Sequence, residues 1–184
     1  MKKIVDFINE TVIKKGSCIV SIDGRCGSGK TTLAEKLAKE TKATVIHMDD
    51  FFLQPQQRMV ERLATPGENI DHERFLQEVL KPLSQGKTAT YRPFLCSKMD
   101  FGDEITVAAP HVVIVEGSYS CHEKLWDYYD LHIFVTVDRH LQLERIRQRD
   151  GAEAIGTFVE KWIPMEEQYF KKFKIAKKCE FVIK

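Results

Sequence analysis

Short apolar runs alternate along the whole chain with longer stretches in which apolar residues recur at helical spacing. Ile4, Ile8 and Val12 follow that spacing and predict an amphipathic helix over residues 3–14. Five other runs are mostly continuous in apolar residues, which is typical of strands that are buried on both faces of a parallel sheet. These predicted strands span residues 18–22, 44–48, 112–115, 132–137 and 180–183.

The segments between these strands are long enough to hold crossover helices. Helical patterns cover residues 32–40, 73–81, 141–149 and about 158–174. Right-handed crossovers between parallel strands place such helices on both faces of the sheet. The sequence therefore predicts one α/β domain over residues 1–184, a three-layer sandwich around a five-stranded parallel sheet.

Residues 51–110 depart from this alternation. The region has one helical pattern, a stretch of β character at 86–90 and much irregular sequence. Long irregular excursions in compact domains are usually functional, so we expect this region to be a functional insertion or a lid.

Composition excludes several classes of protein. The chain has 184 residues, 28 Lys and Arg against 27 Asp and Glu, and 43% hydrophobic residues, which is typical of a globular protein without a basic field for nucleic acid. Its apolar runs are far shorter than the ~20 residues that cross a membrane. The five cysteines form no C-x-x-C pair and indicate reduced thiols, so we expect a cytoplasmic protein. A net charge of +1 also allows a homo-oligomer.

Residues 24–31 match the phosphate-binding pattern G-x-x-x-x-G-K-[ST], directly after a predicted strand and before a predicted helix. This order aims backbone N–H groups and a helix dipole at an anion. Lys30 can reach the β- and γ-phosphates of ATP or GTP, and the Thr31 hydroxyl can ligate Mg²⁺. Cys26 is interpreted as a tolerated loop residue whose side chain faces solvent. The predicted nucleotide-binding residues are Gly24, Arg25, Cys26, Gly27, Ser28, Gly29, Lys30, Thr31 and Thr32.

Carboxylates follow the second and third predicted strands. Ligands of open parallel sheets bind beyond the carboxyl ends of the strands, where Asp49, Asp50 and Glu116 lie. One aspartate can take the proton of an acceptor hydroxyl while the other is structural, and Glu116 fits a place beside the metal. The alternatives are a turn or helix cap for the aspartates and a loop ion pair for Glu116. His47 is expected to be packed and hydrogen-bonded rather than a ligand.

Two arginines share one face of the helix predicted near residue 145. Arg145 and Arg149 are four residues apart, whereas Arg147 points largely away. Two guanidinium groups on one face can clamp a phosphate, and the glycines of a lid at about 145–156 can act as its hinge. The alternative is a solvated helix with salt bridges to neighbouring acids.

Polar and aromatic residues of the insertion are candidates for binding the acceptor. Asp71 can accept two hydrogen bonds from a sugar diol, Tyr91 can stack on a ring, and Arg92 favours an anionic acceptor. The alternatives are a helix N-cap for Asp71 and a core position for Tyr91.

The ordered set of segments 24–31, 48–52, 71–91, 113–117 and 145–150 resembles the uridine kinase-like branch of the phosphoribulokinase/uridine kinase family. The resemblance implies a P-loop nucleoside/nucleotide kinase-like fold with a small lid, and Mg-ATP-dependent phosphorylation of a hydroxyl on a nucleoside. It selects Asp49 as the base, with Lys30, Arg145 and Arg149 completing the catalytic set. In the same way it implies metal binding by Thr31 and Glu116, and acceptor binding by Asp49, Asp71, Tyr91 and Arg92.

Two departures from that family pattern bear on the acceptor. Gly-Ala-Glu-Ala-Ile-Gly follows Asp150 in place of an acidic-Arg-Gly-Arg run, and Tyr91 is followed by Arg rather than Asp. Alternative acceptors are nicotinamide riboside, pantothenate and a sugar phosphate. A further alternative is a regulatory nucleotide-binding module without an acceptor, although the chain has neither an N-K-x-D motif nor an Asp-Glu pair after the third strand.

Overall fold

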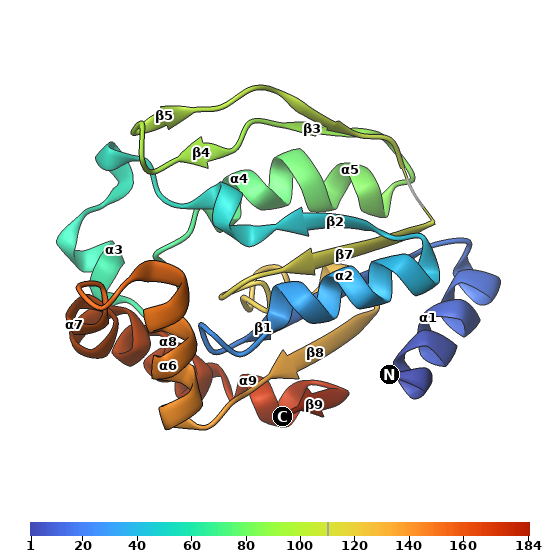
Figure 1. The fold of residues 1–184 in the computed structure, drawn as a ribbon. Coiled ribbons are helices and arrows are strands. Elements are labelled where there is room, and N and C mark those ends of the chain that lie inside the picture. Colours follow the sequence, from blue (N-terminus) through green and yellow to red (C-terminus); the bar gives the residue numbers. More distant parts are fainter. Residues whose placement is uncertain (110) are drawn as a thin grey trace.

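A five-stranded parallel sheet forms the centre of the computed structural model, which describes residues 1–109 and 111–184 (Figure 1). The strand order is β2-β7-β1-β8-β9. The predicted α/β fold and its five strands are thus confirmed, with shifts of one or two residues at strand ends. The strands are β1 (Cys18–Gly24), β2 (Thr44–His47), β7 (Val112–Glu116), β8 (Leu131–Val135) and β9 (Phe181–Ile183).

Strand β1 lies in the middle of the sheet and sets its register. Val20 pairs with Ile114 of β7 on one side and with Leu131 of β8 on the other. Every residue of β1, β7 and β8 is buried, which explains why these strands are continuous apolar runs rather than alternating ones. Because all pairs are parallel, the carboxyl ends of β1, β2 and β7 meet at one edge of the sheet.

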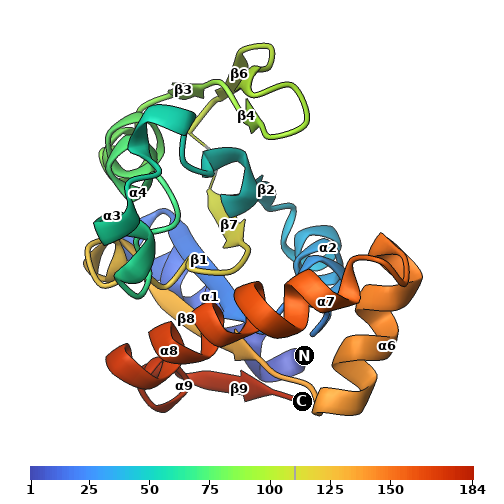
Figure 2. The same ribbon diagram turned by 90° about the vertical axis from the view of Figure 1, so that its left-hand side faces the viewer.

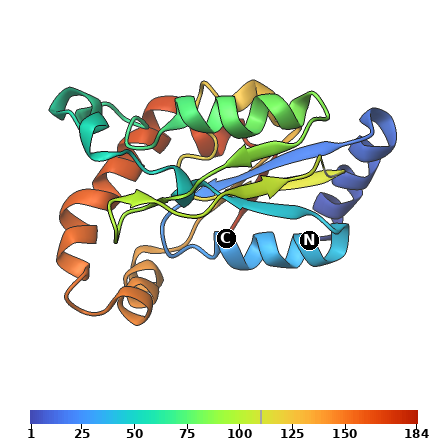
Figure 3. The same ribbon diagram turned by 90° about the horizontal axis from the view of Figure 1, so that it is seen from above.

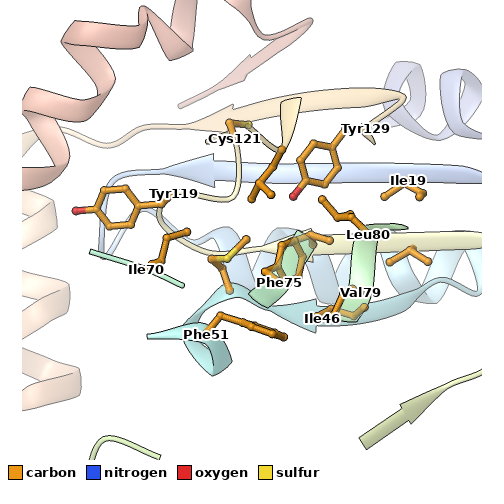
Figure 4. Packing of buried hydrophobic residues seen from close by; sticks show 14 of the residues in the cluster. Ile19, Ile46, Phe51, Ile70, Phe75, Val79, Leu80, Tyr119, Cys121 and Tyr129 are labelled. Carbon is orange, nitrogen blue, oxygen red and sulfur yellow. The ribbon is translucent and has the colours of Figure 1, made fainter. Parts of the chain in front are cut away.

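Helices cover both faces of the sheet, as the three-layer prediction requires (Figure 3). On one face, Ile8 of α1 (Lys2–Lys15) and Leu37 of α2 (Lys30–Thr41) pack with strand residues such as Val20. On the other face, Phe75 and Leu80 pack against Ile46 and its neighbours (Figure 4). The elements of this second layer are α4 (His72–Phe75), η3 (Leu76–Leu80), α5 (Lys81–Ser84), α8 (Ile163–Phe173) and α9 (Ile175–Lys178).

Two of the predicted helices contain a π-helical turn. One turn is η3, and the other is η5 (Phe158–Trp162), which joins α7 (Ile155–Thr157) to α8. Each turn ends two residues before a proline, Pro82 or Pro164. Because proline lacks an N–H and its ring crowds the carbonyl four residues earlier, the wider turn lets the helix pass the proline without breaking.

The strands of the insertion lie beyond β2 and α5 (Figure 1), whereas its helical segments α4, η3 and α5 belong to the second layer. The β character expected at 86–90 appears as β3 (Ala89–Tyr91), which pairs antiparallel with β6 (Ile105–Val107) outside the main sheet. The other insertion elements are η1 (Met48–Phe51), η2 (Pro55–Gln57), α3 (Val60–Ala64), β4 (Phe94–Leu95) and β5 (Asp100–Phe101).

Helix α6 (Arg139–Asp150) and the α7–α8 segment lie beside the carboxyl ends of the strands (Figure 2). Asp138 caps α6 by accepting a hydrogen bond from Leu141 N, and the helix ends at Gly151, whose φ of 91° favours glycine. A short 3-10 turn, η4 (Trp126–Tyr128), precedes β8. No helix within 1–109 or 111–184 is long and apolar enough to span a membrane.

Candidate active site

A cavity of about 400 Å³ opens at the carboxyl ends of β1, β2 and β7. Its wall combines the phosphate loop, the residues after β2 and β7, helix α6 and the helical segment that follows it. Eleven of the predicted site residues line it: Cys26, Gly27, Ser28, Gly29, Lys30, Thr31, Thr32, Asp49, Glu116, Arg145 and Arg149.

The phosphate loop holds its shape through glycines in the left-handed region. Gly27 has a φ of 70° and Gly29 a φ of 97°, and a Cβ on Gly24 would lie 1.9 Å from the carbonyl oxygen of Val135. No side chain caps the start of α2 at Lys30, so its first N–H groups face the cavity. Within the described chain, the buried Ser28 Oγ has no hydrogen-bond partner either. A loop with this set of free donors fits an anion such as a nucleotide phosphate.

Lys30 is buried at the base of the cavity. Its Nζ donates to the carbonyl oxygens of Gly24 (2.8 Å) and Arg25 (3.0 Å) and to Ser118 Oγ (3.4 Å). These partners keep the ammonium group within the loop and pointed at the place where a phosphate would lie.

Thr31, Glu116 and His47 form a polar group beside Lys30. Glu116 Oε1 accepts hydrogen bonds from Thr31 Oγ1 (3.2 Å) and lies 2.6 Å from His47 Nδ1. The Glu116 hydrogen bond raises the pKa of His47. The Thr31 hydroxyl and the Glu116 carboxylate thus lie side by side. Both are oxygen ligands of the kind that Mg²⁺ binds in proteins, so the chemistry of this pair fits that ion.

The structure distinguishes the two aspartates after β2. Asp49 lines the cavity, and its enclosure raises the pKa of the carboxyl, while Lys30 and Arg149 oppose the rise. Asp50 points elsewhere, since its Oδ2 accepts a hydrogen bond from Tyr91 Oη (3.3 Å). Asp49 is therefore the aspartate that can meet a ligand in the cavity.

The paired arginines of α6 both reach the wall. Arg145 Nη1 donates to the carbonyl oxygens of Gly27 (3.2 Å) and Ser28 (3.4 Å). Arg149 forms a hydrogen-bonded ion pair with Asp150 at 2.8 Å, which raises the pKa of the guanidinium. The predicted sharing of one helix face thus brings two cations to the phosphate loop.

Three predictions for the phosphate loop need correction. The Cys26 side chain does not face solvent, because it packs with Ile146 and Ile163 and only 8% of the residue is exposed. Arg25 points away from the cavity: its guanidinium donates to Glu167 Oε2 (3.0 Å) and to Thr136 Oγ1. Gly24 contributes its carbonyl to Lys30 rather than to the cavity wall.

Residues of α6 and α8 that the sequence analysis did not single out hold this loop. Glu166 accepts hydrogen bonds from Cys26 N (3.0 Å) and Ser118 Oγ (2.6 Å). Gln142 Nε2 donates to the Cys26 carbonyl oxygen at 3.0 Å. No local sequence signal marks these partners, because each depends on how a distant helix packs on the loop.

Asp23 is a third missed residue and lies fully buried next to the loop. Its carboxylate accepts hydrogen bonds from the backbone N–H groups of Gly24 (2.7 Å), Tyr119 (3.1 Å) and Cys121 (3.0 Å). Tyr169 Oη donates a fourth at 2.8 Å. Burial raises the pKa of Asp23 to about 6. The signal for it is its position as the acid directly before the glycine that opens the loop.

The three predicted acceptor residues of the insertion do not line the described cavity. Asp71 caps α4, accepting from Arg74 N (3.0 Å), as its alternative interpretation predicted. Tyr91 is buried and donates to Asp50, and Arg92 Nε donates to the carbonyl oxygen of Gly102 at 2.7 Å. In their place the wall holds Phe52, Asn69, Tyr119, Phe158 and Trp162.

Comparison with known proteins agrees with this geometry. A family model described as "AAA domain" matches residues 20–161. The uridine kinase of Staphylococcus aureus (strain JH9) is 30% identical over 177 residues, which cover 85% of this chain and 83% of the relative. The chain belongs to the uridine kinase-like family of P-loop kinases.

Two solved structures share the fold of this chain. A Bacillus stearothermophilus protein described as a "Possible Uridine Kinase" superposes with a TM-score of 0.74 at 18% identity, over 100% of this chain and 98% of that one. A Silicibacter sp. TM1040 protein, whose name refers to a fructose transport system kinase, has a TM-score of 0.74 at 20% identity, with 99% and 98% covered. At these identities the likeness concerns the fold.

Proposed function

We propose that this kinase transfers the γ-phosphoryl group of ATP, with Mg²⁺, to a hydroxyl of a small molecule, and that the acceptor is a nucleoside. The observation that carries the proposal is the placement of Asp49, Lys30 and the Thr31–Glu116 pair on the wall of one cavity. The 30% identity to a uridine kinase supports the choice of acceptor.

The phosphate loop and the start of α2 would hold the nucleotide phosphates, with Lys30 as the cation beside them. Thr31 and Glu116 would hold Mg²⁺, which supplies charge neutralisation at phosphate oxygens. Arg145 and Arg149 add positive charge on the facing wall, where negative charge develops during transfer.

Asp49 orients the acceptor hydroxyl and takes its proton. Desolvation of the carboxyl raises its pKa, which makes Asp49 a stronger base than an ordinary aspartate. The positive charges of Lys30 and Arg149 oppose that rise and favour the carboxylate, the form that accepts a proton.

The test compares Asp49→Asn with the matched variant Asp50→Asn. Each protein is incubated with Mg-ATP and a panel of nucleosides, nicotinamide riboside, pantothenate and sugar phosphates, and products are measured by mass spectrometry. Asp49→Asn should lower turnover by about 10²- to 10⁴-fold, the usual contribution of a general base, while Asp50→Asn stays within about 10-fold of the unmodified protein.

The outcomes separate the candidates. A phosphorylated nucleoside whose formation depends on Asp49 supports the proposal. If only another member of the panel is phosphorylated, the acceptor belongs to that compound's class instead of the nucleosides. Binding of ATP without any product favours a regulatory nucleotide-binding module, and unchanged turnover in Asp49→Asn removes Asp49 as the base.

A further inference from the structure

The buried carboxylate of Asp23 joins the phosphate loop to the connection that follows β7. Asp23 lies in β1 directly before Gly24, and none of its surface is exposed. Its Oδ1 accepts hydrogen bonds from the backbone N–H groups of Gly24 (2.7 Å) and Tyr119 (3.1 Å). One carboxylate oxygen thus holds together two segments that lie far apart in the chain.

The other oxygen of Asp23 ties the same connection to a helix. Its Oδ2 accepts hydrogen bonds from Cys121 N (3.0 Å) and from Tyr169 Oη of α8 (2.8 Å). Each oxygen therefore receives two donors, which suits the ionised form, because a carboxylate is an acceptor at every position. A protonated carboxyl or an amide in this place would turn a hydrogen toward one of these donors.

Lys30 lies between the two segments that Asp23 joins. Its Nζ donates to the carbonyl oxygen of Gly24 (2.8 Å) and to Ser118 Oγ (3.4 Å). The first partner belongs to the loop, and the second precedes the residue whose N–H donates to Asp23. The position of the carboxylate therefore sets the spacing between two partners of the ammonium group.

The connection after β7 is held in a conformation that side chains rarely adopt. Tyr119 has a φ of 72°, in the left-handed region, where residues other than glycine are uncommon. A residue stays in such a conformation only where its surroundings fix it, and the hydrogen bond from Tyr119 N to Asp23 is one of the contacts that do so. Strain of this kind gathers at binding and catalytic sites, which fits a role for Asp23 in arranging the cavity.

We infer that Asp23 is a positioning residue: its carboxylate holds the phosphate loop and residues 118–121 at the spacing with which Lys30 meets the β- and γ-phosphates of a nucleotide. The inference rests on the nucleotide-binding part of the proposed function. Asp23 is not among the described residues that line the cavity, so it acts through Lys30 and Ser118. AMP lacks the two phosphates concerned and separates this role from general support of the fold.

The first experiment measures the dissociation constants of Mg-ATP and of AMP by calorimetry. The unmodified protein should bind Mg-ATP more tightly than AMP. Asp23→Asn disrupts at least one hydrogen bond to the carboxylate, so its affinity for Mg-ATP should fall about 10- to 100-fold, while its affinity for AMP should change by less than about 3-fold. Asp6→Asn makes the same change on the exposed side of α1 and should bind both nucleotides as the unmodified protein does.

A second experiment keeps Asp23 and changes the pH at which it ionises. Burial raises the pKa of Asp23 to about 6, and the hydrogen bond from Tyr169 Oη opposes this rise, so Tyr169→Phe should raise the pKa further. The other titratable groups that face Asp23 are those of Lys30, Tyr119, Cys121 and Tyr129. Of these only Lys30 is charged, and its charge also opposes the rise.

The affinity for Mg-ATP should fall as the pH drops through about 6, because protonation of Asp23 removes an acceptor from the connection. In Tyr169→Phe the fall should begin about one pH unit higher. Comparing the two proteins cancels the titration of the nucleotide itself. Because a raised carboxyl pKa makes the fold more stable as the pH falls, protonation of Asp23 does not lower the affinity by unfolding the protein. Tyr128→Phe makes the same change in η4 and should keep the unmodified profile.

The inference is overturned if Asp23→Asn weakens the binding of Mg-ATP and AMP alike or of neither. It is equally overturned if Tyr169→Phe keeps the pH profile of the unmodified protein, an outcome that does not require Asp23→Asn to fold. A protein that phosphorylates a nucleoside but shows neither effect would keep the proposed function without this inference. Binding of Mg-ATP that depends on Asp23, without any phosphorylated product, would leave the inference standing and refute the proposed transfer reaction.

Discussion

Replacing His122 by Phe should make the protein less sensitive to acid. His122 is buried in the connection between β7 and β8, its ring stacks on His72 with centroids 4.2 Å apart, and Glu68 and Lys124 lie nearby. Burial, and next the charge of His72, lower the pKa of His122 from 6.5 to about 4. The neutral imidazole is therefore the form that the fold accepts.

The sign and size of the effect follow from this difference in pKa. Above pH 6.5 His122 is neutral in both states and contributes no pH dependence. Between pH 6.5 and 4 the unfolded chain binds a proton that the folded chain does not, so stability is lost as the pH falls. At pH 5 the loss amounts to about 2 kcal/mol, and it approaches about 3 kcal/mol below pH 4.

Urea unfolding of both proteins at pH 7 and pH 5 measures this contribution. Asp23 acts in the opposite direction, because a carboxyl with a raised pKa of about 6 makes the fold more stable as the pH falls, so the profile of one protein alone does not isolate His122. The difference between His122→Phe and the unmodified protein does isolate it. That difference should shift by about 2 kcal/mol in favour of the variant at pH 5. A difference that stays the same at both pH values would refute the reasoning.

Three further predictions concern the phosphate loop and its surroundings. Gly24→Ala places a Cβ 1.9 Å from a carbonyl oxygen of β8, so we expect a loss of about 4 kcal/mol or more in the free energy of unfolding. A variant whose thermal midpoint equals that of the unmodified protein would contradict this. The hydrogen bond with the Glu116 carboxylate raises the pKa of His47, so Glu116→Gln should lower it. An NMR titration in which the imidazole of the variant titrates as in the unmodified protein would contradict this. Burial raises the pKa of the Cys26 thiol to about 12, so at pH 8 a disulfide reagent should label the exposed Cys96 and leave Cys26 unlabelled, as peptide mapping can show; equal labelling would place Cys26 at the surface.

The strands and the phosphate loop could be predicted because their signals are local. A strand covered on both faces must be apolar throughout, and a loop that wraps a phosphate needs glycines at fixed places. The carboxyl-end rule also located Asp49 and Glu116 correctly at one edge of the sheet. Spacing on a helix was enough to bring Arg145 and Arg149 to the same wall.

Contacts between distant segments could not be predicted in this way. His47 lies beside Glu116 only because β2 and β7 pair in that register, which neither strand specifies alone. Arg25 turns away because Glu167, 142 residues later, lies on a neighbouring helix. The cavity-lining residues Asn69 and Trp162 were missed for the same reason, since only the fold brings them to the cavity.

The segment from Gly151 to Trp162 is attached to the phosphate loop at both of its ends. Before it, Gln142 and Arg145 of α6 bond to loop carbonyl oxygens, and after it, Glu166 of α8 bonds to the Cys26 N–H. Because both ends of this segment are held by the phosphate loop, the segment cannot rotate open about a single glycine hinge.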